Sequence, residues 1–120
     1  MNNILDIELH MRSFAESFML EARKDKWAGL LCERPSNIII QSSKIFNHLN
    51  HNYIEQNNEL DNVAPYDNVG VFYDFIGEPK CISFKDAIAE GKNHDAIFSI
   101  NPGKLVVCFF HDGWNFVCTK

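Results

Sequence analysis

An Asp-Gly pair near the end of the chain is the sequence feature that most constrains the fold. Asp112 and Gly113 separate two apolar runs, Leu105–Phe110 and Asn115–Cys118. A tight β-hairpin turn needs positive φ at its central residues, which Asp and Gly tolerate. The pattern therefore predicts a C-terminal hairpin with a two-residue turn. Because Leu105–Phe110 is apolar at every position, we expect it to be a strand inside the sheet, not at its edge.

Three segments before this hairpin predict more strands. Val69–Ile76 and Asp95–Ile100 are apolar runs with β-branched residues, and Lys80–Phe84 can pair back on the first of them. Asn101–Lys104 has Pro and Gly at the two central positions of a type II turn, directly before the last two strands. Together with the hairpin, these segments predict an antiparallel sheet of about five strands.

Two helices are predicted before the sheet. Apolar residues recur at steps of three and four over residues 3–25, and again over residues 37–56. The β-branched triplet Ile38–Ile40 could instead form a short strand at the start of the second segment. Between the two helices, Trp27–Cys32 is an apolar connector that we expect to pack against the core.

One short helix is predicted within the sheet region. Ser83 can cap a helix over Phe84–Glu90, and Gly91 can end it in the left-handed conformation. The fold class that follows is α+β, with two N-terminal helices packed on a C-terminal antiparallel sheet and one short inserted helix.

Four cysteines, at positions 32, 81, 108 and 118, are dispersed without a C-x-x-C pair. A two-residue turn would place Val107 opposite Cys118 and Cys108 opposite Val117. The Cys108 and Cys118 sulfurs would then point to opposite faces of the sheet, which argues against a disulfide between them. We expect all four to be reduced, buried thiols.

The chain is short and acidic, which bounds its organisation and its partners. It has 120 residues, 46% of them hydrophobic, and a net charge of −5. This length suits one domain, residues 1–120, with a single core. A net negative charge disfavours direct binding to nucleic acid or to an anionic membrane, because both attract basic surfaces. No run is long enough for a membrane span and no secretory signal is recognisable, so we expect a cytoplasmic protein.

The acidic excess is confined to one third of the chain. Residues 55–95 carry nine acids and three lysines, a local net charge of −6, whereas residues 1–54 carry six of each sign. Such a segment is either a solvated surface or a docking face for a basic protein, with aromatic anchors and carboxylates that pair with Arg or Lys. Trp114 is either such an anchor or a cap over the sheet edge. The candidate partner-binding residues are Glu55, Glu59, Asp61, Tyr66, Asp67, Asp74, Glu78 and Trp114.

No residue pattern identifies a reaction or a metal site. His48 and His51 could share one helix face, but no third ligand has diagnostic spacing. His111 and Asp112 join a base to a carboxylate in sequence, yet neighbours on a strand point to opposite faces. The nucleophile and glycine-rich phosphate-binding motifs are missing from the sequence. We therefore expect a non-catalytic protein without a metal or cofactor.

In its length, its α+β order, its acidic 55–95 segment and its ending Val106–Trp114, the chain resembles the small acidic immunity proteins that bacteria encode beside polymorphic or contact-dependent inhibition toxins. The resemblance implies a binder that covers the active cleft of a cognate toxin domain, often a nuclease with a basic cleft. An acidic inhibitor would match such a cleft by occupying its phosphate-binding positions. No residue of those proteins is carried over to this sequence.

A second class with a similar order of elements is the cone-shaped, nuclear-transport-factor-2-like domain, which binds a small ligand or acts as an enzyme. In that class Phe72, Asp74, Phe109, His111 and Trp114 would converge on a pocket. The long polar stretch after the second predicted helix departs from this pattern, because a strand is expected soon after that helix. A third alternative is an interaction subunit of another complex. A toxin-like reading frame beside the gene would favour inhibition, and a deep apolar pocket holding His or Asp would favour the enzyme.

Overall fold

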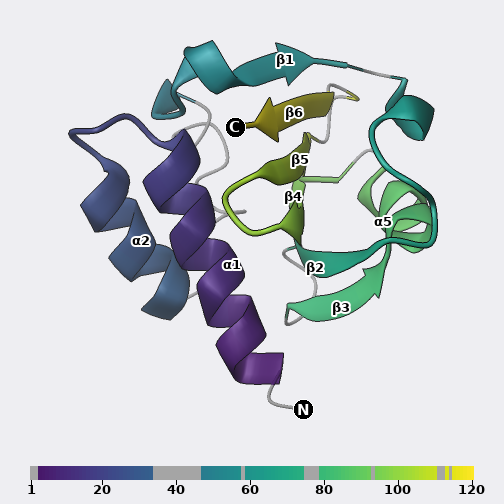
Figure 1. Cartoon of the computed structure of the whole chain (residues 1–120), viewed down its shortest axis with the longest axis horizontal. Coiled ribbons are helices and arrows are strands. Elements are labelled where there is room, and N and C mark those ends of the chain that lie inside the picture. The colour runs from purple at the N-terminus through teal and green to yellow at the C-terminus, as the bar shows by residue number, and fades with distance from the viewer. Residues whose placement is uncertain are drawn as a thin grey trace.

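A six-stranded antiparallel sheet lies between two helical layers in the computed structural model (Figure 1). Helices α1 (Asn3–Phe18) and α2 (Lys24–Glu33) pack together on one face of the sheet, and helix α5 (Phe84–Gly91) lies on the other. The structure describes residues 3–33, 47–57, 59–74, 79–92, 94–110, 113 and 115–120. Among them, no helix combines the length and the apolar character needed to cross a membrane.

The strand order is β1-β6-β5-β4-β2-β3, and every neighbouring pair is antiparallel. The α+β prediction is confirmed, with β5 inside the sheet between β4 and β6. Strand β1 adds a sixth strand to the five expected. The strands are β1 (Ile54–Gln56), β2 (Val69–Asp74), β3 (Lys80–Ser83), β4 (Ala96–Asn101), β5 (Leu105–Phe109) and β6 (Asn115–Thr119), and the 3₁₀ turns are η1 (His51–Tyr53) and η2 (Leu60–Asn62).

Helix α1 is shorter than the predicted helix over residues 3–25, because the chain leaves the helix at Met19. Met19 forms a β-bridge with Leu49. The Asn50 N–H donates to the Phe18 carbonyl over 2.7 Å, and this bond satisfies one of the carbonyls that a helix end leaves without a partner. A contact with a distant segment therefore ends the helix, and the local apolar spacing does not reveal it.

The segment predicted as a connector, Trp27–Cys32, is part of helix α2. The side chains of Trp27 and Ala28 are buried against the core, as their apolar character predicts. The Trp27 Nε1–H donates to His48 Nδ1 over 2.9 Å. This bond ties α2 to the residues just before η1 and gives the buried indole N–H the partner that it needs.

The second predicted helix, residues 37–56, is wrong at its C-terminal end. Residues 34–46, including the triplet Ile38–Ile40, lie outside the described residues, and the last residues of the predicted helix form η1 and β1. Ile54 packs on the α1 face of the sheet, whereas Glu55 is paired with Val117 and points to the other face. The three residues of β1 are too few for their apolar pattern to distinguish the alternation of a strand from the spacing of a helix.

Two apolar clusters cover the two faces of the sheet. The alternation along β5 explains its continuous apolar sequence, because Val106 and Cys108 face α1 whereas Val107 and Phe109 face α5. The α1-face cluster includes Met11, Phe14, Ala15, Phe18, Trp27, Val71, Tyr73, Ile97, Val106, Cys108 and Cys118. The α5-face cluster includes Leu60, Phe72, Phe84, Ala87, Phe98, Val107, Phe109 and Val117.

The C-terminal hairpin is confirmed, but its predicted register is wrong by one residue. Val107 pairs with Val117, and the Gly113 N–H donates to the Phe110 carbonyl over 3.0 Å. Gly113 has a φ of 93°. The turn therefore starts at Phe110 and is longer than two residues, which matches hairpin loops that place a Gly in the left-handed region. His111, Asp112 and Trp114 lie outside the described residues.

The longer turn reverses the predicted facing of two cysteines, although both are free and buried as predicted. Cys118 pairs with Val106, so Cys118 and Cys108 lie on the same face, both buried in the α1-face cluster. Their thiols are free, and a hydrogen bond of the protonated Cys108 thiol to the Cys118 side chain, together with burial, raises the pKa of Cys108 well above its ordinary value. Cys81 is also free but exposed on β3, contrary to the prediction that it is buried. The side chain of Cys32 lies outside the described part of the chain.

The raised pKa of Cys108 predicts a loss of stability at alkaline pH. The folded protein holds this proton more tightly than the unfolded chain does, so its contribution is complete below the unfolded pKa of about 8.5 and is lost as the pH rises through the folded value. Between the two values the slope is at most about 1.4 kcal/mol per pH unit. Urea unfolding from pH 7 upward should show a steeper decline for the wild type than for Cys108→Ala. Cys81→Ala should keep the wild-type decline, and parallel curves for the wild type and Cys108→Ala would contradict the prediction.

The turn before β5 and the start of α5 confirm two local predictions. The Lys104 N–H donates to the Asn101 carbonyl over 2.9 Å, and Gly103 has the positive φ, 70°, that the third residue of a type II turn requires. The Ser83 side chain caps α5 by accepting a hydrogen bond from the Asp86 N–H.

The end of α5 differs from the prediction, because Gly91 is the last helical residue and not a left-handed stop. A Cβ at this position would lie 2.7 Å from Cγ of Phe109. Glycine is therefore required here by the close approach of α5 to the Phe109 ring, and not by the backbone angle.

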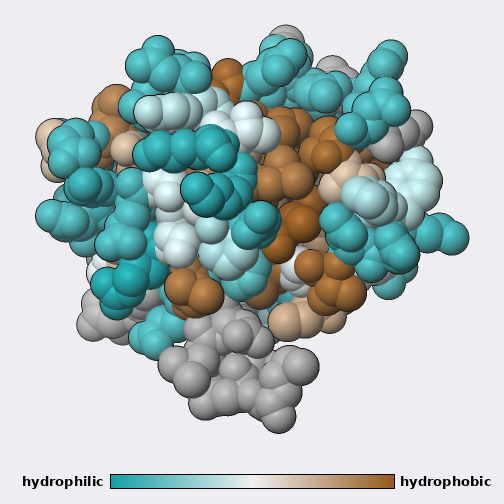
Figure 2. All heavy atoms as spheres, viewed as in Figure 1, coloured by the Kyte–Doolittle hydropathy of each residue, from teal (hydrophilic) through white to brown (hydrophobic). Residues whose placement is uncertain are grey.

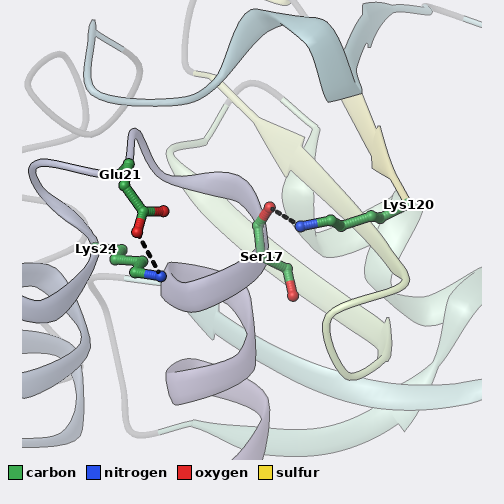
Figure 3. A network of polar contacts seen from close by, with 4 residues as sticks. All are labelled: Ser17, Glu21, Lys24 and Lys120. Atoms are coloured by element: carbon green, nitrogen blue, oxygen red, sulfur yellow. Dashed lines mark hydrogen bonds and ion pairs between the residues drawn. The ribbon is translucent and has the colours of Figure 1, made fainter.

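The C-terminal residue is held against the helical layer. The Lys120 Nζ donates to the carbonyl of Ser17 in the last turn of α1 over 3.4 Å, where a cation is favourable (Figure 3). The same ammonium lies 4.8 Å from the centre of the Tyr53 ring. In the turn after α1, an exposed Glu21–Lys24 ion pair of 3.0 Å raises the pKa of Lys24 through its hydrogen bond.

Candidate functional site

The acidic part of the sequence is carried across the α5 face of the sheet by residues 57–68, which we call the crossing segment. It starts where the Asn57 N–H donates to the carbonyl of Asn115, the first residue of β6, and Leu60 then packs into the α5-face cluster. Near its end, the Tyr66 carbonyl accepts from the Lys85 N–H over 3.0 Å, and the Asn68 carbonyl accepts from the first N–H of α5 over 2.7 Å. The backbone of α5 therefore holds the crossing segment in place.

Three of the predicted partner-binding acids are exposed on this side of the molecule. Glu55 points to the α5 face from the edge strand β1, and Glu59 and Asp67 lie near the two ends of the crossing segment. None of the three forms an ion pair with another described residue. From residue 52 to residue 79 the sequence contains six acids and no Lys, Arg or His. The carboxylates are therefore not neutralised by cations within their own stretch of chain.

Tyr66 is the aromatic residue of the predicted set that lies beside these acids. Its side chain is 47% exposed, and its ring centre lies 6.5 Å from that of the buried Phe84. The ring thus contacts the core and is also exposed at the surface, as expected of an aromatic contact residue at an interface.

The structure does not bring the whole predicted set together. Asp74 is at the far end of β2 from the crossing segment, with its backbone opposite Ala96. The side chains of Asp61, which belongs to η2, and of Asp74 lie outside the described part of the chain, as do Glu78 and Trp114 entirely. The described site therefore consists of Glu55, Glu59, Tyr66 and Asp67.

Two of the residues proposed to line a ligand pocket are part of the core. Phe72 and Phe109 are both buried, and their ring centres lie 6.5 Å apart at 58°, within the cluster under α5. Phe72 also contacts Phe98 with a separation of 6.4 Å. This packing assigns Phe72 and Phe109 a structural role. Of the other pocket residues, His111 and Trp114 lie outside the described residues.

The histidine pair suggested by the sequence is not placed on one helix face. His48 accepts the Trp27 hydrogen bond at Nδ1, and His51 begins η1. Within the described residues, no group of three or more His, Cys, Asp or Glu side chains is arranged to hold a metal ion.

A serine and a histidine that the sequence analysis did not connect meet between α1 and the sheet. His10 Nδ1 and Ser99 Oγ are 2.6 Å apart, and Ser99 is fully buried. A serine next to a histidine can be a nucleophile, but this hydroxyl is enclosed beneath α1. We therefore assign the pair an anchoring role between α1 and β4. The two residues are 89 positions apart, so no local motif signals their contact.

The chain matches no protein-family model, no curated protein and no solved structure.

Proposed function

We propose that the chain is a non-catalytic binding protein that neutralises a basic toxin domain, often a nuclease, by covering its active cleft. The observation that carries the proposal is the stretch from residue 52 to residue 79, which has six acids and no basic residue. Its described carboxylates Glu55, Glu59 and Asp67 are exposed on one side of the sheet. Such a surface attracts a basic cleft, speeds encounter with it, and disfavours nucleic acid itself.

The geometry supports binding better than catalysis. The crossing segment is held to α5 by backbone hydrogen bonds, so its carboxylates are presented from a fixed scaffold and less conformational entropy is lost on binding. The buried Ser99 and the hydrogen-bonded His48 have roles within the fold. In this proposal the inhibitor acts in the cytoplasm, where a nuclease toxin would meet its substrate.

The test is co-expression with the product of the neighbouring gene. We expect the two proteins to co-purify as a stoichiometric complex, the chain to protect cells from the toxin, and added chain to abolish the toxin's activity in vitro. A neighbouring product that is neither bound nor inhibited would contradict the proposal.

A further inference from the structure

The α5 face of the sheet carries an apolar patch that the short helix α5 does not cover. We define the patch as Val63, Ala64, Ile82, Ile100 and Leu105, all half-buried side chains packed against the α5-face cluster. Figure 2 shows a continuous apolar area over the ends of β4 and β5, with hydrophilic side chains on both sides. On the opposite face, two longer helices bury the corresponding row of side chains.

The sheet register explains why this end of the face is apolar and open. Leu105 lies opposite Asn101 on β4, and Ile82 lies opposite Gly70 on β2. A Cβ on Gly70 would lie 2.5 Å from the Ser99 carbonyl oxygen and 2.9 Å from the tip of the Phe98 ring. The absence of a side chain at Gly70 lets the tip of the Phe98 ring lie against β2 beside Ile82, so the surface at this end of the face is formed by the half-buried apolar side chains.

Two acids of the crossing segment lie on the same side of the sheet as the patch. Val63 and Ala64 belong to the crossing segment, which also carries Glu59 and Asp67, and all of these residues lie on the α5 side of the sheet. Of the lysines on this side, Lys80 is paired with Glu90. Lys85 in α5, Lys92 just after it and Lys104 just before β5 are exposed. The apolar patch is therefore combined with a carboxylate-rich rim along one side.

We propose that this patch is the docking centre for a basic protein segment that inserts an apolar side chain between its own lysines or arginines. Buried apolar anchors carry most of the affinity at protein interfaces, whereas rim charges mainly steer association. The patch supplies the apolar contact surface, and the charges that steer association come from Glu55, Glu59 and Asp67. A second copy of the acidic chain would bring like charges together at the same rim, so the charge favours a cationic partner. The inference rests on the proposed function only for the nature of that partner.

The test measures the affinity of two synthetic peptides for the full chain. NMR of the backbone amides then shows which residues each peptide contacts. One is a lysine-rich peptide with a central leucine–phenylalanine pair, and the other has two serines in place of that pair. We expect the apolar peptide to bind at least roughly tenfold more tightly. We also expect it to shift the signals of Val63, Ala64, Ile100 and Leu105. Equal affinities, or shifts confined to other residues, would overturn the proposal.

A pair of substitutions separates apolar anchoring from charge. Val63→Asp with Ala64→Asp makes the site more acidic but less apolar, and we expect it to remove the preference for the apolar peptide. The matched control is Leu9→Asp with Val69→Asp, which adds the same charge at side chains that are 54% and 63% exposed outside the patch, and it should leave the preference intact. If the first variant does not fold, the milder Val63→Ser should still reduce the preference. An unchanged or larger preference for the apolar peptide in the patch variants would overturn the proposal.

Two more outcomes separate this inference from the proposed function. Self-association of the free protein through the patch residues, seen as concentration-dependent shifts without peptide, would overturn the inference, because a second copy would then be the occupant. If the chain does not bind the neighbouring gene product but still prefers the apolar peptide, the docking centre is supported. Only the toxin-inhibitor function is then rejected.

Discussion

Replacing Phe98 with alanine is expected to lower the free energy of unfolding by about 3–5 kcal/mol, the range for removal of a buried aromatic ring. Phe98 is fully buried in the α5-face cluster. Its ring stacks on Phe84 with centres 5.8 Å apart and planes at 4°, and it also contacts Phe72. Small domains have a total stability of about 5–15 kcal/mol, so the variant should be close to unfolding. Urea or guanidinium titration at 25 °C measures the difference.

The matched control removes an exposed ring that contacts the same cluster from outside. Tyr66 also contacts Phe84 but is 47% exposed, so Tyr66→Ala should cost less than about 1 kcal/mol. Phe98→Leu, which keeps most of the buried volume, should lie between the two. Equal losses for Phe98→Ala and Tyr66→Ala would mean that Phe98 does not organise the core under α5.

Local chemistry predicted the C-terminal half of the fold, but not the residues that depend on distant contacts. The Ser83 side chain caps a helix, and the lack of a side chain at Gly103 permits a positive φ in the turn. Both predictions are confirmed. The Asp-Gly pair located the last turn without fixing its length. A shift of one residue in register moves every side chain to the other face. For that reason the predicted facing of Cys108 and Cys118 was wrong, although both are free and buried as predicted.

The candidate site was predictable in composition but not in geometry. The acidic excess is visible in the sequence, whereas the path of the crossing segment depends on the pairing of β1 with β6. The three residues of β1 carry no strand signal of their own, because Ile54 is the single apolar residue among them. The patch was missed for a similar reason: Ile100 and Leu105 look like ordinary core residues, and their exposure follows from the short length of α5.

Reversing Glu59, Asp61 and Asp67 together to lysine is expected to weaken binding to the toxin domain by roughly a hundredfold or more. Charges around a docking surface can change the association rate by about 10–1000-fold, and a reversal turns attraction into repulsion. Rim charges act mainly on encounter, so the association rate should fall most at low salt, where screening is weakest. Surface plasmon resonance over a range of salt concentrations measures both effects.

A second triple variant shows whether position or net charge is responsible. Glu16, Glu21 and Asp25 are exposed on the α1 and α2 side, and reversing them to lysine changes the net charge by the same amount. Both variants should remain folded, because exposed carboxylates contribute at most about 1 kcal/mol each to stability. If the docking surface lies on the α5 face, the control should keep most of the wild-type affinity at physiological salt, where charges more than about 8 Å apart are largely screened. If instead the crossing-segment variant binds and protects like the wild type with an unchanged salt dependence, the acids form only a solvated surface and the docking model is wrong.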